Sequence, residues 1–211
     1  MKEELKNFIQ NSAFPCIMAK AVAAQGLIHP VTINQLEGED VIKHVLDGLY
    51  DFVEQYRLDE EKLSSFALVI DNDKYGSFEI FEKAFWKFLS DVNQEDKFDY
   101  SPDPRVSADP LDSNFSFSIK SEAFFILALH PESPRWARRF KYPAIIFNPH
   151  QQFERLRTKG VFSKVRDIIR FKDKLLQGDI NPMLNDFGEI SEVFQYSGKV
   201  HNLDGPVPLS I

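Results

Sequence analysis

Three short apolar runs between residues 115 and 148 constrain most strongly how this chain can fold. They read FSFSIKS, EAFFILALH and YPAIIFN, and short connections join them. Runs of this length, rich in aromatic and β-branched residues, are typical of β-strands. An earlier apolar run, SSFALVID, predicts a further inner strand. The chain is therefore expected to contain a β-sheet.

Segments with helical periodicity lie on both sides of these runs. GEDVIKHVLDGLYDFVEQYRL and GSFEIFEKAFWKFLSDVNQ place apolar residues at the spacing that is typical of amphipathic helices. QQFERLRTKGVFSKVRDIIRFKDKLLQG is expected to be helical, with a break at Gly160 and an end at Gly178. NPMLNDFG predicts a short helix opened by Asn181, because Asn is a favoured N-cap and Pro a favoured first residue. Near the N-terminus, KEELKNFIQ has helical spacing, and FPCIMAKAVAAQG fits either a buried helix or an extended segment.

Together these elements predict an α+β fold. We expect a single domain over residues 1–211, with a central mixed sheet of about four to six strands flanked by helices. Residues 96–113 are rich in Pro, Asp and Ser, which indicates a long exposed loop or lid.

Composition excludes several classes of protein. A net charge of -7 argues against a general nucleic-acid binder, which needs a dominant basic face. The single cysteine, Cys16, excludes an internal disulfide and a CxxC metal site. No apolar stretch suits a signal peptide or a membrane span, so we expect a cytoplasmic protein without a membrane partner. No glycine-rich motif indicates a nucleotide cofactor.

The segment over residues 130–170 is basic within this acidic chain. It holds ten Lys or Arg residues and three acids, a local charge of +7. Guanidinium groups match carboxylates and phosphates, so such a segment can hold an anionic ligand. This role is assigned to three arginines that follow a predicted strand, Arg135, Arg138 and Arg139. The alternative is a solvated face that pairs with the acidic helix over residues 37–61, and it applies best to Lys159, Lys164 and Arg166.

Two histidines follow predicted strands in the same segment. His130 ends the run FFILALH, and His150 ends PAIIFNPH and should open the following helix. Ligands of open α/β sheets bind at strand ends, so parallel neighbouring strands would bring both imidazoles to one crevice. Either histidine could instead be a hydrogen-bonded core residue. The spacings typical of zinc sites and of serine nucleophiles do not occur. A haem site requires fewer features in the sequence than these sites do: an axial imidazole, an apolar cavity and cations for two propionates.

Several blocks of the sequence resemble the YqcI/YcgG family of bacterial proteins. They read FPCIMAKAV, HPESPRWARRF, FNPHQQFERLR and LQGDINPMLNDFGEISEVFQYSGK, and the resemblance spans residues 14–199. It implies a haem-dependent N-oxygenase, because characterised members hydroxylate guanidine nitrogens of arginine or an arginine-derived amino acid. Lys172 and Lys199 stand where that family often has arginine, so they keep the charge but lose the planar fork.

The resemblance implies haem b bound by an axial histidine. We favour His130, which follows the most apolar strand, with His150 as the second candidate. His29 is the third, and its other interpretation is a turn residue before Pro30. Cys16 is an alternative thiolate ligand, although a cysteine in such a run is more often buried and inert. The cations for propionates or a substrate carboxylate would be Arg135, Arg138, Arg139 and Arg157.

The acidic block GEISEVFQYSG supplies candidate substrate-binding residues. On a helix, Glu189 and Glu192 would share a face and could receive a guanidinium group, with Tyr196 nearby. The alternative is a capping arrangement, in which Ser191 or Glu192 merely starts or stops a helix. We therefore expect N-hydroxylation of a guanidine or amine nitrogen of an arginine-like small molecule, with an unidentified electron donor and no assigned catalytic residue. The alternatives are a non-catalytic binder of haem or of an anionic small molecule through residues 130–170, and a regulatory protein that has lost the chemistry.

Overall fold

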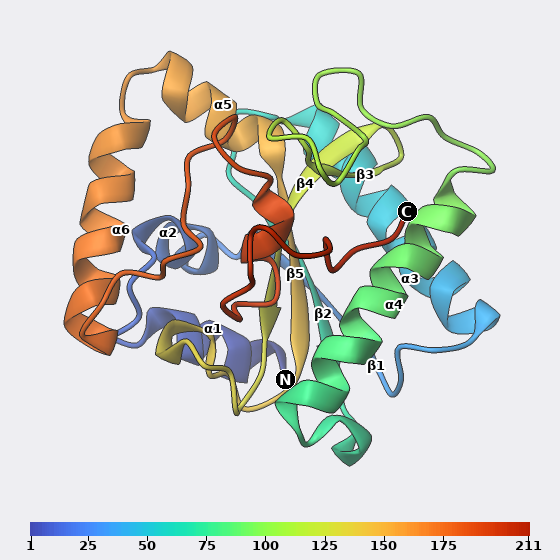
Figure 1. Ribbon diagram of the computed structural model, residues 1–211, viewed down its shortest axis with the longest axis horizontal. Helices are drawn as coiled ribbons and strands as arrows, with labels where there is room; N and C mark the ends of the chain where they lie inside the picture. The colour runs from blue at the N-terminus through green and yellow to red at the C-terminus, as the bar shows by residue number, and fades with distance from the viewer.

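A five-stranded mixed sheet lies between two layers of helices in the computed structural model, which describes residues 1–211 (Figure 1). The strands are β1 (Ile28–Ile33), β2 (Ser65–Ile70), β3 (Phe117–Ile119), β4 (Glu122–Leu129) and β5 (Ala144–Pro149). The helices are α1 (Lys2–Gln10), α2 (Ile17–Ala24), α3 (Glu39–Leu58), α4 (Phe78–Asp96), α5 (His150–Thr158) and α6 (Phe162–Gln177). The strand order is β1-β2-β5-β4-β3, and only β1 and β2 are parallel. The expected α+β class and single domain are confirmed.

The two faces of the sheet carry cores of unequal size. Alternate residues of a strand point to opposite faces, so Phe66 and Leu68 face α3 and α4, whereas Ala67 and Val69 face α1. The α3–α4 side holds a core of 30 buried residues, and the other side holds one of 8. Figure 1 shows α3 and α4 on one side of the sheet and α1, α2 and α6 on the other. The thinner core leaves space beside α1, α2 and α6.

Both edges of the sheet have unusual strands. β1, which the sequence did not predict, pairs only with β2 and contains His29 and Pro30, so the alternative interpretation of His29 as a turn residue is wrong. Proline is tolerated there because an edge strand leaves some of its N–H groups outside the ladder. At the other edge β3 has only three residues, which pair with the first residues of β4. Further along β4, the N–H of Ala128 donates to the carbonyl of Tyr196 at 2.8 Å.

The pairing direction of β4 and β5 separates the two histidines that follow them. The strands are neighbours, as Leu127 opposite Ile146 shows, but they run antiparallel. The carboxyl end of β4 therefore lies beside the amino end of β5, and the two carboxyl ends point in opposite directions along the strands. The condition under which His130 and His150 would face one crevice is not met.

The C-terminal third combines confirmed and corrected expectations. α5 and α6 are separated near Gly160, and α6 ends at Gly178, whose φ of 93° suits glycine. The short helix expected after Asn181 does not form. The Asn181 side chain instead accepts the N–H of Met183 at 3.0 Å and closes a turn, after which the chain is irregular up to the 3₁₀ turn at Glu192–Gln195.

The long loop predicted at 96–113 begins one residue later, because α4 includes Asp96. Asp103, which is 1% exposed, fixes this loop to the sheet. Its carboxylate accepts the N–H of Ala123 at 3.0 Å and pairs with Arg105 at 2.6 Å. None of the six helices has the length and apolar composition that crossing a bilayer requires.

Replacing Asp103 with Ala is expected to lower the free energy of unfolding by about 2–3 kcal/mol, because the buried N–H of Ala123 loses its acceptor. Asp109→Ala is the matched control: that side chain is exposed in the same loop and accepts only the N–H of Leu111. Urea unfolding of both variants measures the difference. Equal, small losses would show that Asp103 does not anchor the loop.

Candidate functional site

A cavity of about 340 Å³ lies on the sheet face beside α1, α2, α5 and α6. Its floor includes Phe125, Leu127 and Ile146 from β4 and β5. Residues 184–187 of the irregular C-terminal segment also line it. Most lining residues are hydrophobic, and the polar ones include His150, Glu192 and several arginines. A mostly apolar cavity with a few polar groups is typical of a small-molecule site.

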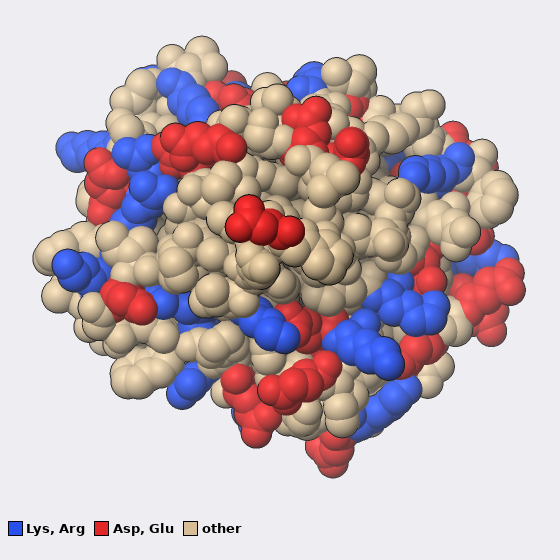
Figure 2. Space-filling view, viewed as in Figure 1, with Lys and Arg blue, Asp and Glu red and all other residues tan.

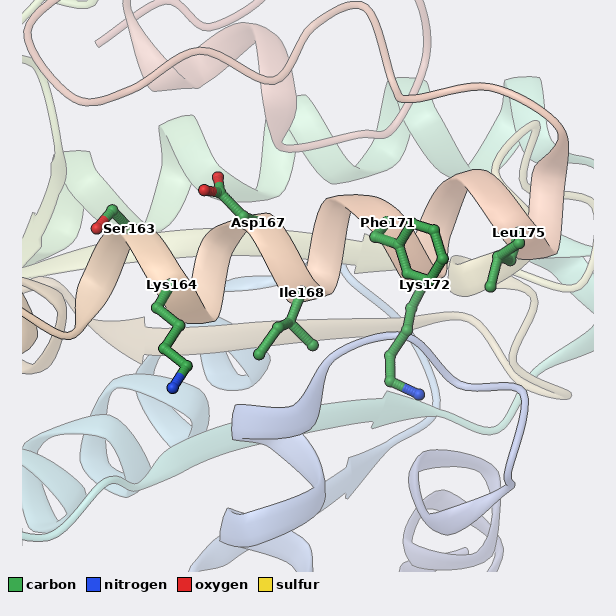
Figure 3. A pocket seen from close by; sticks show the side chains of 7 residues that line it. All are labelled: Ser163, Lys164, Asp167, Ile168, Phe171, Lys172 and Leu175. Carbon is green, nitrogen blue, oxygen red and sulfur yellow. The ribbon is translucent and has the colours of Figure 1, made fainter.

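Helix α6 has two apolar faces. Phe162, Val165 and Ile169 line the cavity. On a second face, shown in Figure 3, Phe171 and Leu175 border a shallow surface groove and are 63% and 70% exposed. The groove shares no lining residue with the cavity.

His150 is the candidate histidine that lines the cavity. It is the first residue of α5, immediately after β5, and is 4% exposed. Its Nε2 lies 3.2 Å from Oε1 of Glu154, and its Nδ1 lies 3.8 Å from Oε2 of Glu192. Neither contact has hydrogen-bond geometry, so both ring nitrogens are buried without a hydrogen-bond partner. Two carboxylates thus flank the ring, and a ligand could complete its hydrogen bonding.

The structure places the other two candidate histidines outside the cavity lining. His130 is fully buried, its Nε2 donates to the carbonyl of Tyr75 at 2.7 Å, and its Nδ1 accepts the N–H of Glu132 at 3.0 Å. No ring nitrogen of His130 is left for a metal, which favours the core interpretation of this residue. The His29 ring packs 5.1 Å from that of Phe52 in α3, on the opposite face of the sheet.

Glu192 is a buried carboxylate with one oxygen fixed by the protein. Its Oε1 accepts hydrogen bonds from Tyr196 at 2.6 Å and Ser116 at 2.8 Å. Its Oε2 has no hydrogen-bond donor and is the oxygen closest to His150. Burial raises the pKa of Glu192 to about 7, although His150, Tyr196 and Ser116 oppose this rise. Burial and the adjacent carboxylate also raise the pKa of Tyr196, so its phenol remains a donor.

Glu189 does not join this group. It is exposed, and its carboxylate accepts the N–H of Asp186 at 3.0 Å. The pair with Glu192 required a helix through both residues, whereas the helical turn begins only at Glu192. Its side chain closes a local turn, and Ser191 precedes the 3₁₀ turn without a side-chain capping hydrogen bond.

The predicted anion-binding arginines divide between cavity and surface. Arg135 and Arg138 line the cavity and are buried, whereas Arg139 is exposed and donates to the carbonyl of Ser133. Arg135 is already paired with Asp173 and Asp179. Arg138 donates to the carbonyls of Tyr196 and Gln195, both at 2.6 Å, and has no carboxylate partner. Burial lowers its pKa to about 10.

Arg157 also lines the cavity. It pairs with Glu154, and its guanidinium carbon lies 4.0 Å from the centre of the Phe162 ring. Its side chain is 29% exposed, so it sits between the cavity and solvent.

Much of the basic segment is neutralised by acids from other parts of the chain. Lys159 pairs with Glu61 at 2.6 Å, which follows the solvated-face alternative. Arg155 pairs with Glu60 at 3.2 Å. On the face shown in Figure 2, basic and acidic side chains lie beside each other. The local charge of +7 therefore does not describe the surface.

Cys16 lines the cavity at the start of α2. Its Sγ accepts the N–H of Ala19 at 3.4 Å, and burial raises the pKa of the thiol. This environment favours the protonated, inert form rather than a thiolate ligand.

Sequence analysis missed Phe187, Asp186 and Ser116, which also contact this site. The Phe187 ring centre lies 4.4 Å from that of His150. Asp186 pairs with Arg166 and Arg170 of α6. The segment DFGEI has no periodicity that would assign it to a cavity, and Ser116 is brought to Glu192 only by the tertiary fold.

Comparison with known proteins settles the family. The YqcI/YcgG family model matches residues 5–210. The chain belongs to the YqcI/YcgG family. The uncharacterized protein YcgG of Bacillus subtilis (strain 168) is 27% identical over 137 residues, covering 62% of this chain and 53% of YcgG. The uncharacterized protein YqcI of the same organism is 29% identical over 87 residues, covering 41% of this chain and 34% of YqcI. The matches thus span about half or less of these relatives. No solved structure matches the chain significantly.

Proposed function

We propose that this chain is a haem-dependent N-oxygenase that hydroxylates a guanidine or amine nitrogen of an arginine-like small molecule. The observation that carries the proposal is His150, a buried imidazole at the wall of a largely apolar cavity, with no well-formed hydrogen bond at either nitrogen. The family resemblance supplies the class of reaction and of substrate. Nothing in this assignment depends on His130 or His29.

The residues around the cavity include the kinds of group that a haem site needs: an imidazole, cations and an apolar lining. His150 would be the residue that holds the haem iron. Arg138, which has no carboxylate partner, would pair with a propionate, whereas Arg135 and Arg157 are already paired with acids and Arg139 is at the surface. The hydrophobic lining would exclude water. When bound, haem would supply the activation of O₂ or peroxide.

Glu192 is the residue of this chain best placed to receive a cationic substrate. Tyr196 and Ser116 hold Oε1, so the free Oε2 can accept hydrogen bonds from a guanidinium group. In its ionised form this carboxylate also compensates the positive charge of the substrate. With O₂ as oxidant, the O–O bond breaks and one oxygen atom enters an N–H bond of the substrate. Two electrons from a donor protein or small reductant and two protons from solvent convert the other oxygen atom to water.

Hemin titration of the purified protein, followed by absorption spectroscopy, tests the assignment. We expect saturable binding with an imidazole-type spectrum in the wild type and in His29→Ala, and at least a roughly tenfold loss of affinity in His150→Ala, as for loss of a strong interaction. His29→Ala is the control because that ring lies on the other face of the sheet. A wild type that does not bind hemin, or a His150→Ala variant that binds it unchanged, would contradict the proposal.

A second candidate is a binding protein without catalysis. It is favoured by Arg138, a buried cation at the cavity wall without a carboxylate partner, which an anionic ligand would neutralise. Incubating the hemin-loaded protein with arginine, reductant and O₂, and analysing products by mass spectrometry, separates the two. The binding protein is favoured if hemin binds but no guanidine in a panel that includes arginine gives a product 16 mass units heavier than itself.

A further inference from the structure

Residues 184–187 form a cover over one side of the cavity, and we call them the cover segment. All four residues line the cavity, although the segment has no regular secondary structure. Backbone hydrogen bonds hold both its ends: Leu184 N–H donates to Asn181 at 3.0 Å, and Gly188 N–H donates to Ser113 at 3.1 Å. The first bond closes a local turn, and the second attaches the chain just after Phe187 to the loop that precedes β3.

Asp186 ties the middle of the cover segment to α6. Its carboxylate receives one hydrogen bond from Arg166 and another, at 3.1 Å, from Arg170. The two arginines are four residues apart, so they lie on the same face of the helix. With the side chain of Asp186 33% exposed, both ion pairs are partly shielded from solvent.

Phe187 packs directly against His150, the candidate haem ligand. Its ring centre lies 4.4 Å from that of His150, with the planes at 59°. Because His150 has no hydrogen bond at either nitrogen, no hydrogen bond fixes the rotation of its ring. The carboxylates of Glu154 and Glu192 flank the ring nitrogens at 3.2 Å and 3.8 Å, and Phe187 is the aromatic ring that packs against the imidazole.

We propose that Phe187 is a positioning residue for the His150 imidazole, and that Asp186, held by Arg166 and Arg170, keeps Phe187 against it. The role of His150 as ligand rests on the proposed function, but its positioning is a property of the metal-free chain. Histidine ligands are usually oriented by a hydrogen bond at the second nitrogen, and here aromatic packing takes that part.

The test is NMR of the metal-free protein with ¹³C- and ¹⁵N-labelled histidine. The His150 ring signals should carry a ring-current shift from Phe187, which Phe187→Leu removes and Phe187→Tyr retains. His130 is an internal control in each spectrum, because it stacks on Phe81 with ring centres 5.2 Å apart. Unmoved His130 signals show that the fold is intact.

Asp186→Asn tests the second half of the proposal. We expect the His150 signals to move toward their positions in Phe187→Leu, because a neutral amide holds the two arginines less strongly. Asp91→Asn is the matched control, since Asp91 also forms a partly exposed ion pair on a helix, with Lys87 at 2.6 Å. Unchanged His150 signals in Asp186→Asn would overturn the role of Asp186.

The outcomes of this test and of the hemin titration are independent. His150 signals that stay in place in Phe187→Leu overturn the positioning role even if hemin binds. If hemin fails to bind while the Phe187→Leu shift is seen, the proposed function falls and the positioning role stands. If both results are positive, the hemin-loaded Phe187→Leu protein should show an altered absorption spectrum that Phe187→Tyr restores.

Discussion

Replacing Gly198 with Ala is expected to lower the free energy of unfolding by about 3 kcal/mol. Gly198 has a φ of 85°, and an added Cβ would lie 2.8 Å from Cδ of Arg138. Arg138 cannot move away easily, because it is buried and its guanidinium donates to the carbonyls of Tyr196 and Gln195. The substitution therefore combines backbone strain with a clash against a fixed side chain.

Gly26→Ala separates these two causes. Gly26 has a similar φ of 72°, but no atom lies within 4 Å of the position of an added Cβ. Its substitution should cost only the backbone strain, about 1 kcal/mol. Urea unfolding at one pH compares the two variants. Equal losses would mean that Arg138 yields to the methyl group and that its contacts do not fix the chain after Tyr196.

The second large effect is a change in how stability depends on pH in Glu192→Gln. The pKa of Glu192 is about 7 in the folded protein against an ordinary value of 4.5, because burial disfavours the charged form. The unfolded chain thus releases the proton more readily. The free energy of unfolding of the wild type should fall as pH rises from about 4.5 to about 7, and this contribution should be constant above that range.

A pKa shift of this size lowers the free energy of unfolding by at most about 3 kcal/mol across this pH range. Gln cannot ionise and can still accept hydrogen bonds from Tyr196 and Ser116, so Glu192→Gln should lack this loss and be the more stable protein at pH 8. Unfolding in urea at pH 5, 6, 7 and 8 measures it, with the exposed Glu189→Gln as control. Parallel pH profiles of wild type and Glu192→Gln would show that the carboxylate is ionised without penalty.

The sequence predicted most elements because their apolar periodicity is strong. The runs at β2, β4 and β5 are short and almost wholly buried, and the helices α3 and α4 bury one stripe each. β1 was missed because IHPVTI holds a histidine and a proline and is only partly buried. The helix expected after Asn181 failed because its side chain closes a turn instead.

The site was less predictable, because tertiary contacts decide it. His130 and His150 have similar local surroundings in the sequence. The carbonyl of Tyr75 and the N–H of Glu132 form hydrogen bonds with the His130 ring, whereas neither nitrogen of His150 has a well-formed hydrogen bond. Strand direction, which separates the two residues, is not encoded by either strand alone. The pairs Arg135–Asp173 and Arg166–Asp186 likewise could not be read from local charge.

Both margins of the sheet are poor templates for an incoming polypeptide. Pro30 removes a backbone donor from β1, β3 is three residues long, and Tyr196 occupies the backbone of β4 beyond it. Exposed, regular strand edges are what recruit further strands in aggregation and fibril formation. A chain built in this way should resist cross-β growth from its native state, and any assembly that it forms should rely on side-chain contacts between surfaces.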